Sequence, residues 1–334
     1  MIKLNLNKSS AASSGRLCAL KRAAALITAA TLTLALLFTA CPNSAGGSGS
    51  SGGAGSTGGT PPADKTYTVG GVQFTMKDIA AVTNGTVGHT DYHVENAPHT
   101  VSLTAYRIGE TEVTQELWEK VMGTNPSNFS GSPEGGEVQE KRPVEWVNWY
   151  QCIAFCNKLS KACNLDPCYT VTGVDFDALN FSNIPTSNNT NWNNAVCDRN
   201  KNGFRLPTEA EWEWAAKGGK DYKWAGTNEE AQLVNYAWYD ANSGNKTHQV
   251  KLKSANGYGL YDMSGNVWEW CWDRYGSFSG TLPPDYEGAA SGGNRVFRGG
   301  SWNFGAVCAA RAFRHYGSPG FRSNNLGLRL VTRP

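Results

Sequence analysis

The spacing of apolar and polar positions predicts a mixed domain with more loop than regular structure. Residues 67–74 and 101–108 show β-rich alternation of apolar and polar side chains, with Gly and Asn turns between them, which predicts short antiparallel strands. After Gly218 the chain is rich in Gly, Asn, Trp and Tyr and shows no helical period. We therefore expect an α+β fold with short antiparallel strands, few helices and long ordered loops.

Three helices are predicted from their boundaries and spacing. Thr114 is a suitable N-cap, and a capping box opens at Thr208. Gly123 and Gly218 follow as C-terminal stops, because glycine readily adopts the left-handed conformation that ends many helices. A further helix is expected over residues 149–161, where apolar side chains recur at helical spacing.

The first 40 residues have the pattern of an export signal. Five cations and no anion precede an almost uncharged apolar run over residues 23–40, which is short for a membrane span. The run ends in Leu-Phe-Thr-Ala before Cys41, which resembles the lipobox of bacterial lipoproteins. We expect residues 1–40 to be a signal peptide and Cys41 to be lipidated. The alternative is an ordinary secretory signal that is cleaved nearby.

A tether is predicted directly after Cys41. Residues 43–60 are nearly all Ser, Gly, Ala and Thr, a composition that cannot bury a core. Its root-mean-square reach is about 25 Å. We expect residues 41–65 to anchor the chain to a membrane and to hold one folded domain, residues 66–334, away from it. The expected location is the bacterial cell envelope, with the lipid in the outer membrane and the domain exposed at the surface.

The charge of the mature chain argues against nucleic acid as a partner. The whole chain carries a formal charge of +2, and the predicted signal holds five cations and no anion. Without the signal the charge is about −3, so no basic excess remains for nucleic acid or an anionic lipid surface. We expect a monomer that contacts the membrane through its lipid alone.

The cysteines permit disulfides without fixing them. Of nine cysteines, Cys18 is lost with the signal and Cys41 is lipidated, which leaves an odd number in the domain. Cys168 and Cys197 flank an insertion rich in Asn and Ser, and we expect a bridge between them. Cys152 and Cys156 lie one turn apart on a predicted helix and are expected to be small buried side chains.

Four sequence blocks then resemble one family. They are GFRLPTEAEWE at residues 203–213, NGYGLYDMSGNVWEW at 256–270, RGGSW at 298–302 and LGLRL at 326–330. In this order they resemble the formylglycine-generating-enzyme, or sulfatase-modifying-factor, family. The resemblance covers roughly residue 67 to the C-terminus and implies a C-type lectin fold.

The resemblance does not extend to the catalytic site of that family. Its enzymes use two cysteines, which bind copper and substrate, shortly after the Gly-Gly-Ser-aromatic block. Here only Cys308 follows that block, and it resembles a structural cysteine beyond the catalytic pair. We therefore expect no formylglycine synthesis, no copper and no enzyme activity. The alternative is an enzyme of the wider family that acts on a peptide or small molecule through a different site, such as Cys271 or Cys308.

Calcium is the cofactor that the resemblance implies. In the family a loop holds this ion through side-chain and main-chain oxygens, and the matching positions here are Asp262, Gly265, Val267 and Glu269. The alternative is a loop closed by hydrogen bonds alone, with Glu269 accepting from backbone amides.

The segment 295–330 is the predicted ligand-binding region. Its framework blocks alternate with positions of unrelated character, a layout that resembles the variable proteins of diversity-generating retroelements, most closely the treponemal kind. Aromatic side chains among Gly, Ser and Asn are typical of an antibody-like binding surface. The alternative is that the aromatic residues form the core of the last strands. The predicted ligand, a protein or another surface molecule, would contact Phe304, Gly305, Val307, Phe313, His315, Tyr316, Gly317, Ser318, Gly320, Phe321, Ser323 and Asn324.

Overall fold

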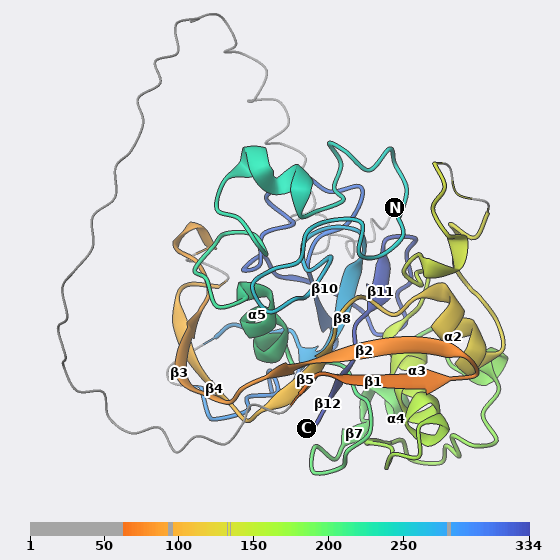
Figure 1. Ribbon diagram of the computed structural model, residues 1–334. Helices are drawn as coiled ribbons and strands as arrows, with labels where there is room; N and C mark the ends of the chain where they lie inside the picture. The colour runs from red at the N-terminus through yellow and green to blue at the C-terminus, as the bar shows by residue number, and fades with distance from the viewer. Residues whose placement is uncertain (1–62, 93–95, 132, 134, 279–281) are drawn as a thin grey trace, which may run out of the picture.

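The computed structural model describes residues 63–92, 96–131, 133, 135–278 and 282–334 (Figure 1). The predicted signal peptide, Cys41 and most of the predicted tether lie outside these residues. Within them, no helix is long and apolar enough to span a membrane.

Two four-stranded sheets organise the domain. In the first, all neighbours are antiparallel, in the order β1 (Lys65–Val69), β2 (Val72–Ile79), β5 (Tyr106–Gly109) and β12 (Val331–Thr332). In the second, the order is β10 (His315–Gly317), β9 (Arg295–Arg298), β8 (Trp268–Arg274) and β11 (Leu326–Leu328). Here β11 runs parallel to β8 and the other pairs are antiparallel. We call this second sheet the C-terminal sheet.

Shorter elements complete the chain. Two small antiparallel sheets are formed by β3 (Val82–Val87) with β4 (His99–Leu103), and by β6 (Tyr169–Thr170) with β7 (Val196–Cys197). The α-helices are α2 (Gln115–Met122), α3 (Trp149–Ala162), α4 (Thr190–Asn193) and α5 (Glu209–Lys217). The 3₁₀ turns are Thr90–Tyr92, Gln139–Lys141, Phe181–Asn183 and Glu230–Asn235.

The three predicted helices are confirmed, together with their caps. Thr114 accepts a hydrogen bond from the Leu117 amide at the start of α2, and Gly123 ends that helix at a φ of 74°. At α5, Thr208 and Glu211 form the predicted capping box. Local sequence therefore sets these boundaries, because each cap is made by residues a few positions apart.

The C-terminal sheet is covered on both faces. One buried cluster packs residues of α2 and α3 against Trp268, Trp270 and Phe297, and a second packs α5 against Cys271 and Val296. Six of the seven residues of β8 are buried for this reason. Tryptophans alternate along β8 with Glu269, Cys271 and Asp273, but the strand is buried on both sides and was not predicted from the sequence.

The predicted bridge between Cys168 and Cys197 is not formed, since both are free thiols. Cys197 lies opposite Tyr169 in the β6–β7 pair, and the amide of the next residue, Asp198, donates to the Cys168 carbonyl at 2.8 Å. This register directs the two cysteine side chains to opposite faces of the small sheet. Cys168 Sγ instead donates to the Gly203 carbonyl at 3.3 Å.

Candidate ligand face

Register in the C-terminal sheet gathers aromatic side chains on one face. Trp270 lies opposite Phe297, and Phe297 lies opposite His315 on the next strand. Residues that face each other across antiparallel strands point to the same side. Trp268, two residues before Trp270, therefore shares this side. We call the surface formed by Trp268, Trp270, Phe297 and His315 the aromatic face.

Three of the predicted ligand positions converge on Trp268. Its ring centroid lies 5.5 Å from that of Phe304, 6.0 Å from Phe313 and 5.5 Å from His315. His315 also stacks on Phe297 with centroids 4.8 Å apart. Burial lowers the pKa of His315, so the imidazole is neutral near pH 7. The predicted segment thus supplies an uncharged aromatic cluster above a framework tryptophan.

Exposure divides the predicted ligand positions into three groups. Phe321 is 46% exposed and Ser318 is also exposed, whereas Phe313 is 8% exposed and belongs to the core. Phe313 therefore follows the alternative interpretation of a core aromatic residue. The half-buried positions are Phe304, Gly305, Val307, His315, Tyr316, Gly317, Gly320, Ser323 and Asn324.

The structure does not place every predicted position on the aromatic face. Tyr316 lies opposite Val296, so it points to the other side of the sheet, and its ring packs on Tyr275 with centroids 4.1 Å apart. The backbone carbonyls of Ser323 and Asn324 accept hydrogen bonds from the Trp146 amide and from Trp302 Nε1, respectively.

Two glycines of the segment lie at close contacts. A Cβ on Gly317 would lie 3.2 Å from Phe297, 3.5 Å from Phe321 and 3.7 Å from Trp270. A Cβ on Gly320 would lie 3.1 Å from the backbone of Ser187 in the Asn- and Ser-rich insertion. This insertion therefore borders the ligand segment. Residues 186–188 are exposed there, and the sequence interpretation did not include them.

The opposite side of the C-terminal sheet is a charged face that consists of buried ion pairs. Arg298 and Arg311, both 0% exposed, donate to the two oxygens of Glu213 on α5. Arg314 makes a bidentate pair with Glu209, with Nε–Oε1 at 2.6 Å and Nη2–Oε2 at 2.7 Å. Charges that are paired and hydrogen-bonded can remain buried, although Arg298 Nε makes no hydrogen bond and lies 3.5 Å from Glu209 Oε1. These pairs connect the ligand segment to α5.

The predicted calcium loop contains a buried oxygen without a hydrogen-bond partner. Oδ2 of Asp262 accepts from the Lys251 amide at 2.9 Å, whereas Oδ1 is buried and has no partner. Burial raises the pKa of Asp262 to about 6. Burial, together with Asp262 and Glu269, also raises the pKa of Glu112 well above its ordinary value. This excess of buried carboxylate fits a divalent cation held by Asp262 and the neighbouring carbonyls.

Glu269, the fourth predicted calcium ligand, is bound by side chains. Arg329 donates from Nη2 to Oε1 at 2.7 Å and from Nε to Oε2 at 3.0 Å. Trp212 Nε1 donates to Oε2 at 2.6 Å. Asp262 therefore keeps one oxygen for an ion, with Gly265 and Val267 as the predicted carbonyl ligands, whereas Glu269 would have to be shared with Arg329.

The two cysteines considered for an enzyme are both in the interior. Cys271 and Cys308 are 0% exposed. Burial raises the pKa of Cys271 well above its ordinary value, which disfavours the nucleophilic thiolate. In the described part of the chain, no group of three or more His, Cys, Asp or Glu side chains is placed to hold a metal ion.

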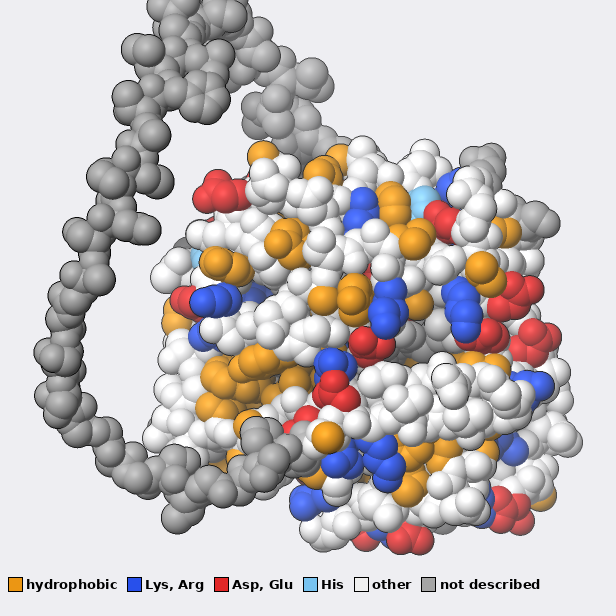
Figure 2. Space-filling view, viewed as in Figure 1, with side chains coloured by type: hydrophobic (Ala, Val, Ile, Leu, Met, Phe, Trp, Pro, Cys, Tyr) orange, Lys and Arg blue, Asp and Glu red, His pale blue; other side chains and the backbone are white. Residues whose placement is uncertain are grey.

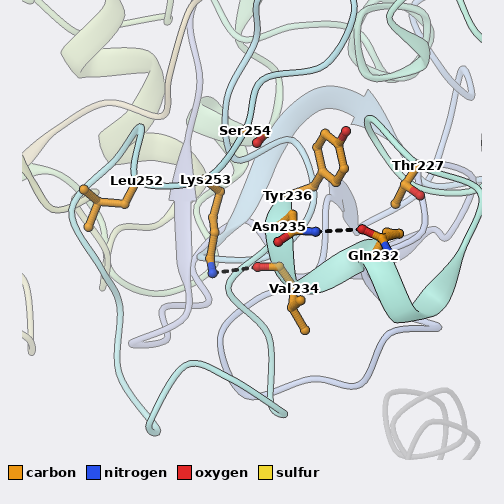
Figure 3. Close-up of a pocket in the computed structure, with 8 residues that line it drawn as sticks. All are labelled: Thr227, Gln232, Val234, Asn235, Tyr236, Leu252, Lys253 and Ser254. Carbon is orange, nitrogen blue, oxygen red and sulfur yellow. Dashed lines mark hydrogen bonds between the residues drawn. The ribbon is translucent and has the colours of Figure 1, made fainter.

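Two hollows lie apart from the predicted ligand positions. One, of about 540 Å³, is shown in Figure 3, where Lys253 Nζ donates to the Val234 carbonyl and Asn235 donates to Gln232. Its polar groups thus bond to one another. The other, also about 540 Å³, lies where the described chain begins, and Figure 2 shows apolar side chains gathered between the end of β2 and α5. No predicted ligand residue lines either hollow.

Comparisons with known proteins confirm the family and the fold class predicted from sequence. The family model of the sulfatase-modifying factor enzyme 1-like domain matches residues 60–334. Treponema denticola variable protein 1 has 63% sequence identity and a TM-score of 0.80, over 82% of this chain and all of that one. Chaperone protein LppX of Paenibacillus barcinonensis is 36% identical over 256 residues, 69% of this chain and 81% of its own.

The catalytic relatives match over a smaller part of their length. The mouse formylglycine-generating enzyme is 36% identical over 181 residues, which is 48% of this chain and 47% of the enzyme. The matched region thus spans about half of that protein. On the extent of the family-model match and the close structural similarity, this chain belongs to the family of sulfatase-modifying factor enzyme 1-like domains.

Proposed function

We propose that this chain is a surface-displayed lipoprotein whose C-terminal segment is a diversifiable ligand-binding site on a non-catalytic scaffold. The similarity to a variable protein at 63% identity supports the diversifiable scaffold. The observation that carries the proposal is the division of the C-terminal sheet. Phe304 and His315 pack on Trp268 of the aromatic face, while Arg298, Arg311 and Arg314 of the framework are bound in ion pairs on the charged face.

This division permits variation without unfolding. Phe304, His315 and Phe321 are partly or fully exposed, and Phe304 and His315 pack against the framework residues Trp268 and Phe297. A substitution at one of these positions changes the surface that a ligand would contact and leaves the buried ion pairs of Arg311 and Arg314 intact. Trp268, Trp270 and Phe297, which were not among the predicted ligand residues, act as the fixed floor. Alternate tryptophans at 268 and 270 were the available sequence signal, because such residues share one side of a strand.

Randomised display tests the diversifiable site. Libraries at Phe304, His315 and Phe321 should retain protease resistance in most members, whereas libraries at Arg298 and Arg311 should lose it. Similar tolerance in the two libraries would contradict the proposal. The genomic test is a near-copy of the DNA for residues 295–330, differing chiefly at adenines, beside a reverse transcriptase gene.

Lipid display is tested separately. The sequence predicts acylation at Cys41 after an export signal. Cells expressing the full chain and fed an alkyne fatty acid should label it, and Cys41→Ser should abolish the label. Cys18→Ser is the matched control and should retain it, because Cys18 lies in the predicted signal. Label on the Cys41→Ser protein would contradict the anchor.

The second candidate, an enzyme with a different site, receives less support. Its nucleophile would be Cys271 or Cys308, and both are fully buried. Cys308 is disulfide-bonded and has no free thiol, so Cys271 carries the test: Cys271→Ser should leave the binding of a selected ligand unchanged if the scaffold does no chemistry. We also propose that calcium, when bound, stabilises the loop of Asp262, Gly265 and Val267 without taking part in a reaction.

A further inference from the structure

Two arginines at one end of the C-terminal sheet lack the acidic partners that Arg298, Arg311 and Arg314 have. Arg274 on β8 lies opposite Arg295 on β9, so both side chains point to the same side of the sheet. Arg295 is 3% exposed and Arg274 is half-buried. In the described residues, their side-chain hydrogen bonds go to backbone carbonyls rather than to carboxylates.

The two guanidinium groups share one acceptor. Nη2 of Arg295 donates to the Asn193 carbonyl at 3.0 Å, and Nη2 of Arg274 donates to the same oxygen at 3.2 Å. Arg295 also donates to the Trp272 carbonyl at 2.6 Å, and its guanidinium carbon lies 3.8 Å from the centroid of the Trp149 ring. Stacking and carbonyl acceptors hold the groups in place but leave their charge uncompensated.

The arginines border a hollow of about 330 Å³. We call it the arginine hollow. Its other walls come from β7 and from the loop after β8, and the residues that matter here are Ala195, Val196, Arg274, Glu287, Ala290 and Arg295. Val196, 64% exposed, lies at its edge, so the hollow is accessible from solvent.

The acids nearby do not cancel this charge. Glu287 is directed to Arg199, with Nη1–Oε1 at 3.3 Å, and its side chain is 47% exposed. Asp273 is buried, and burial together with Glu209 raises its pKa well above the ordinary value, which favours the neutral acid. Burial, reinforced by Arg274, lowers the pKa of Arg295 to about 9. The site is therefore electropositive and would gain stability from an anion.

We propose that the arginine hollow binds an oxyanion, namely a phosphate, sulfate or carboxylate group. Guanidinium groups match such anions through parallel N–H donors, and two adjacent guanidiniums in a partly desolvated hollow suit one anionic group better than a neutral ligand. The volume is sufficient for a single phosphate or sulfate group together with the first atoms of the molecule that carries it.

The arginine hollow adjoins the aromatic face. Arg295 lies opposite Gly317 and two residues before Phe297, so all three share one side of the sheet. Trp268, Trp270 and Phe297 are themselves buried, so a ligand would contact the half-buried and exposed positions above them, such as His315, and an anionic group on that ligand could reach the arginine hollow. The anion site itself does not depend on the proposed diversifiable function, because neither Arg274 nor Arg295 is a predicted ligand position.

Calorimetric titration of the purified protein with sodium phosphate, sulfate and acetate, each against sodium chloride at equal ionic strength, tests the site. Binding of at least one oxyanion is expected. Arg274→Gln should weaken it at least about tenfold through loss of a charge-assisted contact. Glu287→Gln should strengthen it about twofold, because a nearby negative charge is removed. Lys120 is an exposed lysine on α2. Lys120→Gln makes the same change in net charge as Arg274→Gln and should have no effect on anion binding.

The outcomes separate the sources of the anion. Binding of phosphate and sulfate without acetate identifies a tetrahedral oxyanion, and binding of acetate alone identifies a carboxylate. If Arg274→Gln fails to fold, Arg274→Lys keeps the charge, loses the planar pair of donors and should still bind more weakly than the wild type. Absence of binding by the wild-type protein, or equal affinity in the folded Arg274 variants, would overturn the proposal.

Discussion

The two faces of the C-terminal sheet bury different kinds of side chain: one buries ion pairs and the other buries aromatic rings. On the charged face, Arg298 and Arg311 meet Glu213 directly, and the surrounding donors satisfy both carboxylate oxygens. On the aromatic face, Trp268 and Phe297 pack without charge against neighbouring rings. A buried ion pair depends on exact partners, whereas an aromatic contact tolerates changes of shape.

This difference shows how one short segment can be both framework and ligand site. Residues of β9 alternate between the faces: Phe297 contributes to the aromatic face and Arg298 to the charged face. The same alternation in β10 places His315 above Phe297. Variation restricted to one side of the strands leaves the other side undisturbed.

The largest expected effect is the loss of the carboxylate on the charged face. Glu213→Ala leaves two fully buried guanidiniums without a partner, so the free energy of unfolding should fall by about 3–5 kcal/mol in urea denaturation. Glu287→Ala, which removes a half-exposed partner of Arg199, is the matched control and should cost about 1 kcal/mol or less. Equal losses in the two variants would remove the distinction between the faces.

Glu145 is a buried carboxylate without an ion pair to any arginine in the described part of the chain, so its ionised form should destabilise the folded protein rather than stabilise it. Burial raises the pKa of Glu145 to about 7, and its Oε2 has no hydrogen-bond partner. Since the folded state holds this proton more tightly than the unfolded state, stability should fall as the pH rises from about 4.5 to 7. Glu145→Gln should reduce this slope, with a difference on the order of 2 kcal/mol at pH 7.5. An unchanged slope in pH-dependent denaturation would contradict the assignment.

Calcium should stabilise the loop beside the charged face by a moderate amount. Free calcium at 100 times its dissociation constant would add about 2.7 kcal/mol to the free energy of unfolding. Asp262→Asn should remove most of this gain, because it replaces the oxygen that lacks a partner. Melting curves in calcium, in magnesium and in chelator provide the measurement. A shift that survives in the Asp262→Asn protein would place the ion elsewhere.

The smallest effects should come from the aromatic face itself. Phe304 is half-buried against Trp268, so Phe304→Ala should cost about 1–2 kcal/mol. Phe321 is 46% exposed, and Phe321→Ala should change stability by no more than about 0.5 kcal/mol. Chemical denaturation of both variants gives the comparison. A large loss for Phe321→Ala would show that it belongs to the core.

Sequence reasoning succeeded where the determining contacts are local. The caps at Thr114 and Thr208 are made within three residues, and both helices begin where the sequence predicts. The four family blocks also predicted the fold, because they occur in the order that is typical of the family. Of the aromatic residues predicted to form one surface patch, Tyr316 packs on Tyr275 on the other side of the sheet, and Phe313 is buried against Trp268, which lies 45 positions earlier in the numbering.

Contacts between distant residues were beyond that reasoning. Arg298 pairs with Glu213, which is 85 positions away in the sequence, and Arg329 pairs with Glu269, which is 60 positions away. The pair with Arg329 explains why Glu269, a predicted calcium ligand, is already bound by a side chain. The meeting of Arg274 and Arg295 required a register shift in β8, which no local pattern in the sequence indicates.

The position of β1 has a mechanical consequence. This five-residue strand lies at the edge of the first sheet, and Lys65, next to the expected tether, lies opposite Met76 at the open end of the β1–β2 hairpin. Tension on the chain before Lys65 would therefore break the β1–β2 hydrogen bonds one after another. Release of β1 would add about 17 Å of length. β1 does not belong to the C-terminal sheet, so the aromatic face would stay assembled while β1 separates from β2.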